Sequence, residues 1–245
     1  MGTVVFDCDS TLTAIEGIDE LAREHRAEVE ALTDAAMRGD VRLEEVYGRR
    51  LALIAPARDR IAQLGKLYVE SVVEDAAETI RCLEAEGIRV RIMSGGLRPA
   101  VEAVAHALGV ESHNVAAVDT YFNGDGSYAG YEQASPLTRS GGKRTLLEVW
   151  RRELKGPVMF VGDGVTDLET QDIADLFVAY AGVIARAPVI AEADVVVRSR
   201  SLAPILPLAL GGHPPAHASS LALYRKGLAL LEPVYRTYFD NGALT

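Results

Sequence analysis

The chain has 245 residues, of which 49% are hydrophobic and 24% are charged. This length favours one core domain that carries an insertion, and the composition is that of a globular protein rather than a disordered chain or a coiled coil. The 35 acidic and 25 basic side chains give a net charge of −10, which disfavours nucleic acid and anionic membrane surfaces as partners. The sequence therefore directs attention to small-molecule chemistry.

We expect no export signal in the N-terminal segment, because no basic stretch precedes a long apolar one there. No apolar run reaches the length of about 18 residues that a membrane span requires, so we expect a cytoplasmic protein. The only cysteines are Cys8 and Cys82, and neither is expected to form a disulfide. The sequence leaves open whether the chain is a monomer or a homodimer.

Short apolar runs alternate with helix-like stretches along most of the chain. The runs are Thr3–Phe6, Val90–Met93, Val158–Val161, Leu176–Tyr180 and Val195–Val197. The expected crossover helices are 75–87, 97–109, 142–155 and 168–175, and the first three end near Gly87, Gly109 and Gly156. This alternation predicts an α/β fold with a Rossmann-like parallel sheet wrapped by helices. Asn-Gly-Asp-Gly within residues 121–131 also predicts a hairpin.

A long helical segment separates the first strand from the second. Its apolar residues step by threes and fours, as in Ile15, Ile18 and Ala22. We therefore expect a helical cap at residues 12–75, inserted into a core of residues 1–11 and 76–211. Residues 212–245 form a C-terminal extension, with a linker-like start and then an amphipathic helix, and their role is not indicated.

Polar residues cluster where the predicted strands end, which is where open α/β sheets bind their ligands. The segments are Asp7-Cys8-Asp9-Ser10-Thr11, Ser94-Gly95-Gly96 and Gly162-Asp163-Gly164-Val165-Thr166-Asp167. Four carboxylates would meet in one cleft, where they repel one another unless a hard cation binds. An all-oxygen set of ligands suits Mg²⁺.

These residue types fit phosphoryl transfer. Asp7 is the candidate nucleophile, and Asp9, on the same side of the strand, can give a proton to the leaving oxygen and later take one from water. Ser94 and the N–H groups of the two glycines after it can surround a phosphate. Lys143, at the start of a later helix, adds a positive charge.

These four motifs resemble those of the haloacid dehalogenase superfamily, and the form Asp7-Cys8-Asp9-Ser10-Thr11 is similar to its phosphoserine phosphatase branch. Further similar segments are EGIDELA at 16–22, AM at 36–37, RLALI at 50–54, FNGDGSYAGY at 122–131, SGGK at 140–143 and GDGVTDLET at 162–170. The resemblance covers roughly residues 4–210.

The resemblance implies a magnesium-dependent phosphomonoesterase that hydrolyses O-phosphoserine in serine biosynthesis, through an aspartyl-phosphate on Asp7 with Asp9 as acid and base. It implies Mg²⁺ held by Asp7, the backbone carbonyl of Asp9 and Asp163, with Asp167 supporting the metal site. The residues that it places around the phosphate are Ser94, Gly95, Gly96, Lys143, Gly164 and Thr166.

The resemblance also implies a binding pocket for the amino-acid part of the substrate. Glu16 is similar to the glutamate that meets the ammonium, and Arg50 to the cap arginine that meets the carboxylate. Met37 would line this pocket, and Arg186 resembles a further basic residue near the substrate. The chain departs from the family's pattern at Leu43, where Phe is usual, and at Arg38, where Gly is frequent.

Two other functions remain open at this point. The same chemistry could act on another small phosphomonoester or transfer the phosphoryl group to an alcohol such as homoserine. A phosphorylatable signalling module of the receiver type also uses a strand-end aspartate and magnesium. The helical cap and the acid/base position of Asp9 argue against the signalling module, because such a module needs a phosphoryl group that persists.

Overall fold

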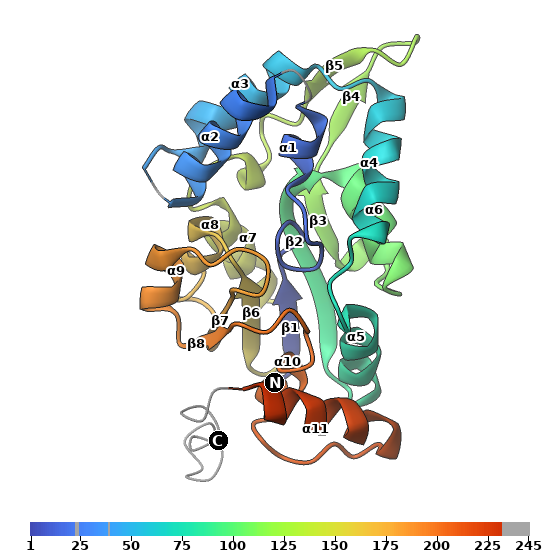
Figure 1. Ribbon diagram of the computed structural model, residues 1–245, viewed down its shortest axis with the longest axis vertical. Coiled ribbons are helices and arrows are strands. Elements are labelled where there is room, and N and C mark those ends of the chain that lie inside the picture. Colours follow the sequence, from blue (N-terminus) through green and yellow to red (C-terminus); the bar gives the residue numbers. More distant parts are fainter. Residues whose placement is uncertain (23–24, 39, 232–245) are drawn as a thin grey trace.

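The computed structural model describes residues 1–22, 25–38 and 40–231 (Figure 1). Its core is a six-stranded sheet in which every neighbouring pair is parallel, in the order β3-β2-β1-β6-β7-β8. The strands are β1 (Thr3–Phe6), β2 (Arg89–Leu97), β3 (Val115–Val118), β6 (Val158–Gly162), β7 (Leu176–Tyr180) and β8 (Val195–Val197). The predicted Rossmann-like parallel sheet is confirmed.

The strand order explains where a site can form. The chain runs outward from β1 to β2 and β3, then returns to the other side of β1 with β6. The carboxyl ends of β1 and β6 therefore lie side by side at a topological switch point, which is where open α/β sheets bind ligands. Every residue of β1, β6 and β7 is buried, as continuous apolar strands covered on both faces should be.

Helices cover both sides of the sheet, with α5 and α6 on one side and α7 and α8 on the other (Figure 1). The core helices are α5 (Ala76–Ala85), α6 (Arg98–Ala107), α7 (Gly142–Arg151), α8 (Val165–Leu168), α9 (Ala187–Glu192) and α10 (Ile205–Ala209), with short 3-10 helices at Ser112–Asn114, Pro136–Thr138 and Ala218–Ser220. Gly87 and Gly109 have positive φ and follow the ends of α5 and α6, as predicted. Gly156 also has positive φ, but it lies in the turn beyond α7, which ends at Arg151 instead of continuing to residue 155.

Strand β3 and helix α8 also differ from the sequence prediction. The edge strand β3 was not predicted, because its run Val-Ala-Ala-Val is short and weakly apolar. The helix expected at 168–175 is wrong, since α8 begins at Val165 and ends at Leu168. Its start is fixed by the Asp167 carboxylate, which accepts the Gly164 N–H at 2.9 Å. The chain then turns back so that Asp175 can accept the Val158 N–H at 2.7 Å.

The insertion between β1 and β2 is helical, as predicted. It contains α1 (Gly17–Leu21), α2 (Arg26–Arg38), α3 (Leu43–Ile54) and α4 (Arg58–Glu70). Single bridges Thr13↔Val72 and Glu74↔Ser201 tie its two ends together and to the core. Helix α4 packs closely on α6, where a Cβ at Gly65 would lie 3.1 Å from that of Ala103. That residues 12–75 act as a separate domain stays a prediction.

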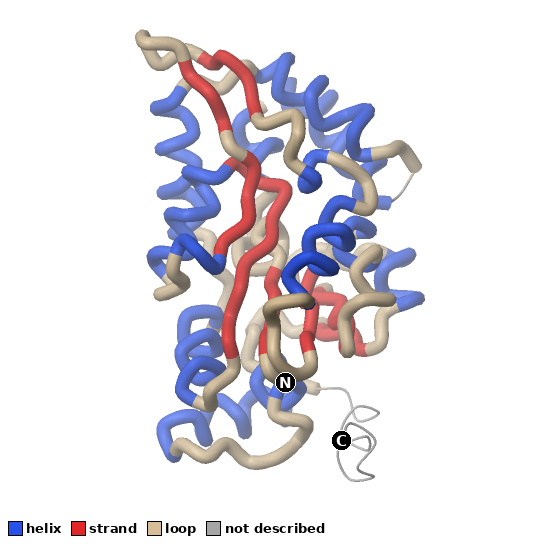
Figure 2. The backbone as a smooth tube through the Cα atoms, turned by 180° about the vertical axis from the view of Figure 1, so that it is seen from behind, coloured by secondary structure: helices blue, strands red, loops and turns tan. Residues whose placement is uncertain are grey.

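The hairpin and the C-terminal helix lie at opposite ends of the molecule. Strands β4 (Thr120–Phe122) and β5 (Tyr128–Tyr131) form the predicted hairpin, which projects beyond the sheet toward the cap (Figure 2). Helix α11 (Leu221–Leu230) packs on α10 near the N-terminus of the chain (Figure 1). No helix in residues 1–22, 25–38 and 40–231 combines the length and apolarity that crossing a bilayer takes.

Candidate active site

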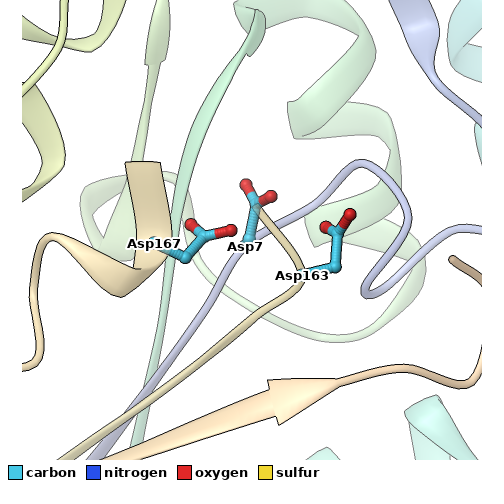
Figure 3. A group of neighbouring side chains, drawn as sticks. All are labelled: Asp7, Asp163 and Asp167. Atoms are coloured by element: carbon cyan, nitrogen blue, oxygen red, sulfur yellow. The ribbon is translucent and has the colours of Figure 1, made fainter. Parts of the chain in front are cut away.

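Three buried aspartates meet at the switch point of the sheet (Figure 3). Asp7 directly follows β1, Asp163 directly follows β6, and Asp167 stands in α8. One carboxylate oxygen from each lies within 4.8 Å of the others. Asp7 lies far from Asp163 and Asp167 in the sequence, and the parallel pairing of β1 with β6 brings the two segments together.

This cluster is electrostatically crowded. Burial, followed by repulsion from Asp167, raises the pKa of Asp7 well above its usual range. Burial also raises the pKa of Asp163 to about 6, although Arg186 opposes this shift. Lys143 is buried among the acids, with Nζ 2.7 Å from Asp7 Oδ1 and 2.6 Å from Asp167 Oδ1. A hard divalent cation would relieve the remaining repulsion, and the all-oxygen donors fit one.

Asp9 is held at the start of the loop that leads from β1 into the cap. The N–H groups of Leu12 and Thr13 both donate to the Cys8 carbonyl, at 2.9 and 3.0 Å, and this tightens the loop. Oδ1 of Asp9 accepts the Gly17 N–H at 2.6 Å and the Tyr68 hydroxyl at 2.5 Å. Its Oδ2 lies 3.3 Å from Ser94 Oγ. Asp9 thus presents one carboxylate oxygen toward the core.

The Ser94–Gly96 segment forms the last part of β2 instead of the start of a helix, and α6 begins at Arg98. The pairing of β2 with β3 shifts register between Met93 and Leu97, so the segment bends away from regular pairing. The Gly96 N–H donates to Ser94 Oγ at 2.9 Å. A Cβ at Gly96 would lie 3.0 Å from Asp9 Oδ2, so glycine permits the close approach.

One pocket lies between the core and the cap, with walls from both. Its lining residues are Asp7, Asp9, Glu16, Ile18, Tyr47, Arg50, Gly95, Gly96, Leu137, Arg139, Lys143, Asp163 and Thr166. The cap also contacts the core at the Ser94–Gly96 segment, where the Tyr47 hydroxyl donates to the Gly95 carbonyl at 2.8 Å. The predicted carboxylates Asp7, Asp9 and Asp163 therefore face a common space with Glu16 and Arg50 of the inserted segment.

Glu16 and Arg186 connect this pocket with the aspartate cluster through hydrogen bonds and ion pairs. Oε1 of Glu16 accepts Ser10 Oγ at 2.8 Å and a terminal nitrogen of Arg186 at 3.0 Å. Arg186 Nε donates to Asp163 Oδ2 at 2.9 Å. Burial, with Asp163 as the next cause, raises the pKa of Glu16 to about 8, and Arg186 opposes it. Because Arg186 is paired with three carboxylates, those of Glu16, Asp163 and Asp34, its direct contact with a substrate stays a prediction.

Arg50 is a buried cation with bonding capacity left over. Its side chain is 3% exposed, and its guanidinium lies 5.6 Å from the centre of the Tyr47 ring. NH1 of Arg50 donates to Thr33 Oγ1 at 2.8 Å, and that hydroxyl donates to Asp19 at 2.5 Å. Nε has no hydrogen-bond partner within the described part of the chain. A buried, unsatisfied guanidinium donor in a pocket wall is suited to an anionic ligand group.

A family profile for haloacid dehalogenase-like hydrolases matches residues 1–170. The chain belongs to this family. Within it, this hydrolase is 36% identical to the phosphoserine phosphatase of Bos taurus over 188 residues, which cover 75% of this chain and 83% of that protein. A phosphoserine phosphohydrolase-like protein from Francisella tularensis superposes with a TM-score of 0.76 at 27% identity, covering 86% of this chain and 99% of the other.

A second solved structure represents a phospho-aspartyl intermediate analogue of phosphoserine phosphatase. It superposes with a TM-score of 0.72 at 28% identity, covering 84% of this chain and 98% of that one. These similarities confirm the resemblance that the motifs indicated, and they place the hydrolase in the phosphoserine phosphatase branch.

Some predicted residues lie beside the pocket of this hydrolase without lining it. Ser94 and Asp167 contact pocket residues Asp9 and Lys143. The N–H of Gly164 is already bonded to Asp167, so its role at a phosphate stays a prediction. Met37 belongs to α2, but its side chain lies outside the described residues, as does that of Leu43.

The sequence reasoning missed four pocket residues, which are Ile18, Tyr47, Leu137 and Arg139. Tyr47 carried a usable signal, because it precedes Arg50 by three positions on one helix and so shares its face. Leu137 and Arg139 gave no such signal, since Leu137 lies in the short 3-10 helix Pro136–Thr138 and Arg139 directly follows it, and the sequence does not reveal the path of this element.

Proposed function

We propose that this haloacid dehalogenase-like hydrolase converts O-phosphoserine and water into serine and inorganic phosphate. The observation that carries the proposal is the composition of the pocket between the core and the cap. Its core wall holds the carboxylates Asp7 and Asp9, and its cap wall holds Glu16 and the incompletely bonded Arg50. These are the groups needed for phosphoryl chemistry on one side and for an amino acid on the other.

The reaction follows from the positions of the two aspartates. A carboxylate oxygen of Asp7 attacks phosphorus, and the bond from phosphorus to the serine oxygen breaks. Asp9 gives its proton to that departing oxygen, so serine leaves as the neutral alcohol. Asp9 then takes a proton from a water molecule, whose oxygen attacks phosphorus and displaces Asp7. Inorganic phosphate leaves, and both aspartates return to their starting states.

Magnesium fits the aspartate cluster by the chemistry of its donors. Asp7, Asp163 and the backbone carbonyl of Asp9 would hold the ion, and Asp167 would support the site from α8. When bound, Mg²⁺ supplies positive charge that offsets both the carboxylates and the phosphate oxygens. Lys143, placed between Asp7 and Asp167, adds a second positive charge on the protein side.

Recognition of the amino acid would use the cap. The ammonium of phosphoserine would meet Glu16, and its carboxylate would meet Arg50, while Ser94, Gly95 and Gly96 surround the phosphate. The relatives named phosphoserine phosphatase support this choice of substrate. We place the reaction in the cytoplasm, as the step of serine biosynthesis that releases the free amino acid.

A substrate screen tests the proposal. Phosphate release would be measured with Mg²⁺ for phosphoserine, phosphothreonine, phosphoethanolamine and para-nitrophenyl phosphate, and again after chelation. We expect the highest kcat/KM for phosphoserine and no turnover without metal. Higher efficiency on a phosphomonoester that lacks the amino-acid groups would overturn the substrate assignment. Adding homoserine and analysing products separates hydrolysis from transfer, since phosphohomoserine would form only by transfer.

A further inference from the structure

Tyr68 stands outside every motif of the chain, yet it contacts Asp9. It lies in α4, 59 positions from Asp9 in the sequence, and its side chain is fully buried. Its hydroxyl donates to Asp9 Oδ1 at 2.5 Å. Tyr68 does not line the pocket, so it cannot touch a substrate there and can act on the reaction only through Asp9.

The bond leaves one oxygen of Asp9 free for chemistry. A carboxylate oxygen offers about two lone-pair sites. Those of Oδ1 are filled by the Gly17 N–H at 2.6 Å and the Tyr68 O–H. Oδ2 has one long contact, with Ser94 Oγ at 3.3 Å, and lies against Gly96. When Asp9 is protonated to act as an acid, its proton is therefore carried on Oδ2, the oxygen that faces Ser94 and Gly96.

Close packing around Tyr68 holds its hydroxyl against Asp9. A Cβ at Gly17 would lie 1.9 Å from the Tyr68 hydroxyl oxygen, so only glycine lets the tyrosine reach Asp9. Helix α4 also packs on α6 of the core through Gly65, so Tyr68 is held by the core as well as by Gly17 of α1. A phenol keeps its proton at neutral pH and so acts as a steady donor to the carboxylate.

We propose that Tyr68 is a positioning residue for proton transfer, which occupies Asp9 Oδ1 and so directs the proton of Asp9 onto Oδ2 at the leaving oxygen. The inference rests on the proposed acid role of Asp9. In the first step the proton moves from Oδ2 to the alcohol oxygen as the bond from phosphorus to oxygen breaks. Without Tyr68, the carboxyl group can rotate, and Oδ1 can hold the proton away from that oxygen.

The test uses the dependence of the reaction on the leaving group. Alkyl alcohols are poor leaving groups and need the proton, whereas para-nitrophenol leaves readily without it. The ratio kcat/KM reports steps up to departure of the alcohol and does not include later hydrolysis of the phosphoenzyme. In Tyr68→Phe, we expect kcat/KM to fall about tenfold or more for phosphoserine and phosphoethanolamine. We expect it to change little for para-nitrophenyl phosphate.

Two comparisons make the result decisive. Tyr180→Phe is the matched control, because it removes a buried tyrosine hydroxyl that donates to the Arg200 carbonyl and not to Asp9. It should leave the ratio of alkyl to aryl efficiency unchanged. Asp9→Asn removes the acid itself, so its loss of kcat/KM on alkyl esters relative to the aryl ester is the upper limit for the effect of Tyr68→Phe. If Tyr68→Phe does not fold, Gly17→Ala replaces it, because the added methyl group pushes the hydroxyl away.

An equal loss on alkyl and aryl substrates in Tyr68→Phe, beside a selective loss in Asp9→Asn, would overturn the inference and assign Tyr68 to packing alone. No selectivity in Asp9→Asn would overturn the acid role of Asp9 and this inference with it. Neither result depends on phosphoserine being the natural substrate, since phosphoethanolamine serves as a second alkyl ester. A failed substrate screen is therefore distinguishable from a failed role for Tyr68.

Discussion

At the scale of single residues, the pocket separates chemistry from recognition. Asp7, Asp9 and Lys143 belong to the core, whereas Glu16 and Arg50 come from the inserted helical segment. A change in Arg50 should therefore affect how an amino-acid phosphate binds without altering the attack on phosphorus.

Replacing Arg50 by alanine tests this separation. Loss of a buried, charge-assisted contact to the substrate carboxylate should cost about 2–4 kcal/mol in kcat/KM for phosphoserine. Phosphoethanolamine has no carboxylate, so its kcat/KM should change much less, and it is the matched substrate for the comparison. An equal loss on both esters would show that Arg50 serves cap folding, and the phosphoserine assignment would lose its physical basis.

Much of the site could be predicted from single residues, for a definite reason. Asp7 and Asp163 directly follow apolar strands, and strand ends of a parallel sheet meet at one edge. Tyr68 could not be predicted, because its partnership with Asp9 depends on how α4 folds back across the sheet edge. The structure also showed that Arg50 reaches Asp19 through Thr33, a contact between three helices that no local pattern indicates.

At the scale of elements, runs of large apolar side chains gave reliable predictions, whereas the alanine-containing run of β3 did not. Strands β1, β7 and β8 have the predicted bounds, since each is a continuous apolar run. Strand β3 has a weaker pattern, and the end of α8 is set by the long-range return of the chain to β6, so both escaped prediction. The C-terminal helix α11 was expected to be amphipathic, but its packing on α10 was not predicted.

Gly227 lies where α11 packs against Ala203 and Pro207, and a substitution there tests this contact. A Cβ there would lie 2.3 Å from the Ala203 carbonyl oxygen, so Gly227→Ala must push α11 off the core. The clash should cost about 1–3 kcal/mol, which outweighs the gain of up to about 1 kcal/mol in helix propensity. Thermal unfolding measures the difference, and we expect a lower Tm.

The control for this variant is Gly124→Ala, because a Cβ at Gly124 meets nothing within 4 Å. It should change stability by no more than about 0.5 kcal/mol. The kcat of folded Gly227→Ala should match the parent, since α11 lies at the end of the sheet away from the pocket (Figure 1). A Tm equal to or above that of the parent would show that α11 is not seated on α10 as described.

At the scale of the whole molecule, the buried acids link stability to pH and metal. The pKa values of Asp7, Asp163 and Glu16 are raised in the folded protein, the latter two to about 6 and about 8. A raised acid pKa means that the folded state binds more protons than the unfolded state. Unfolding free energy therefore falls as pH rises from the ordinary carboxyl pKa of about 4 to about 8.

We accordingly expect the Tm of chelated protein to be higher at about pH 5 than at about pH 8, and added Mg²⁺ to raise Tm more at the higher pH. Asp163→Asn removes one of the titrating acids and should flatten the pH dependence of the metal-free protein. Metal-free stability that rises steadily over this range, with no effect of Asp163→Asn, would contradict the placement of these acids in one buried cluster.

In the proposed reaction, phosphoserine passes its phosphoryl group to Asp7. The direct measurement is rapid acid quenching of the enzyme during turnover of phosphoserine with Mg²⁺, followed by peptide mass spectrometry. We predict a phosphoryl group on Asp7 that hydroxylamine removes, together with no phosphoenzyme and no turnover in folded Asp7→Asn. Phosphate release that continues in Asp7→Asn, or a phosphoryl group trapped on a different residue, would contradict the role of Asp7 as the nucleophile.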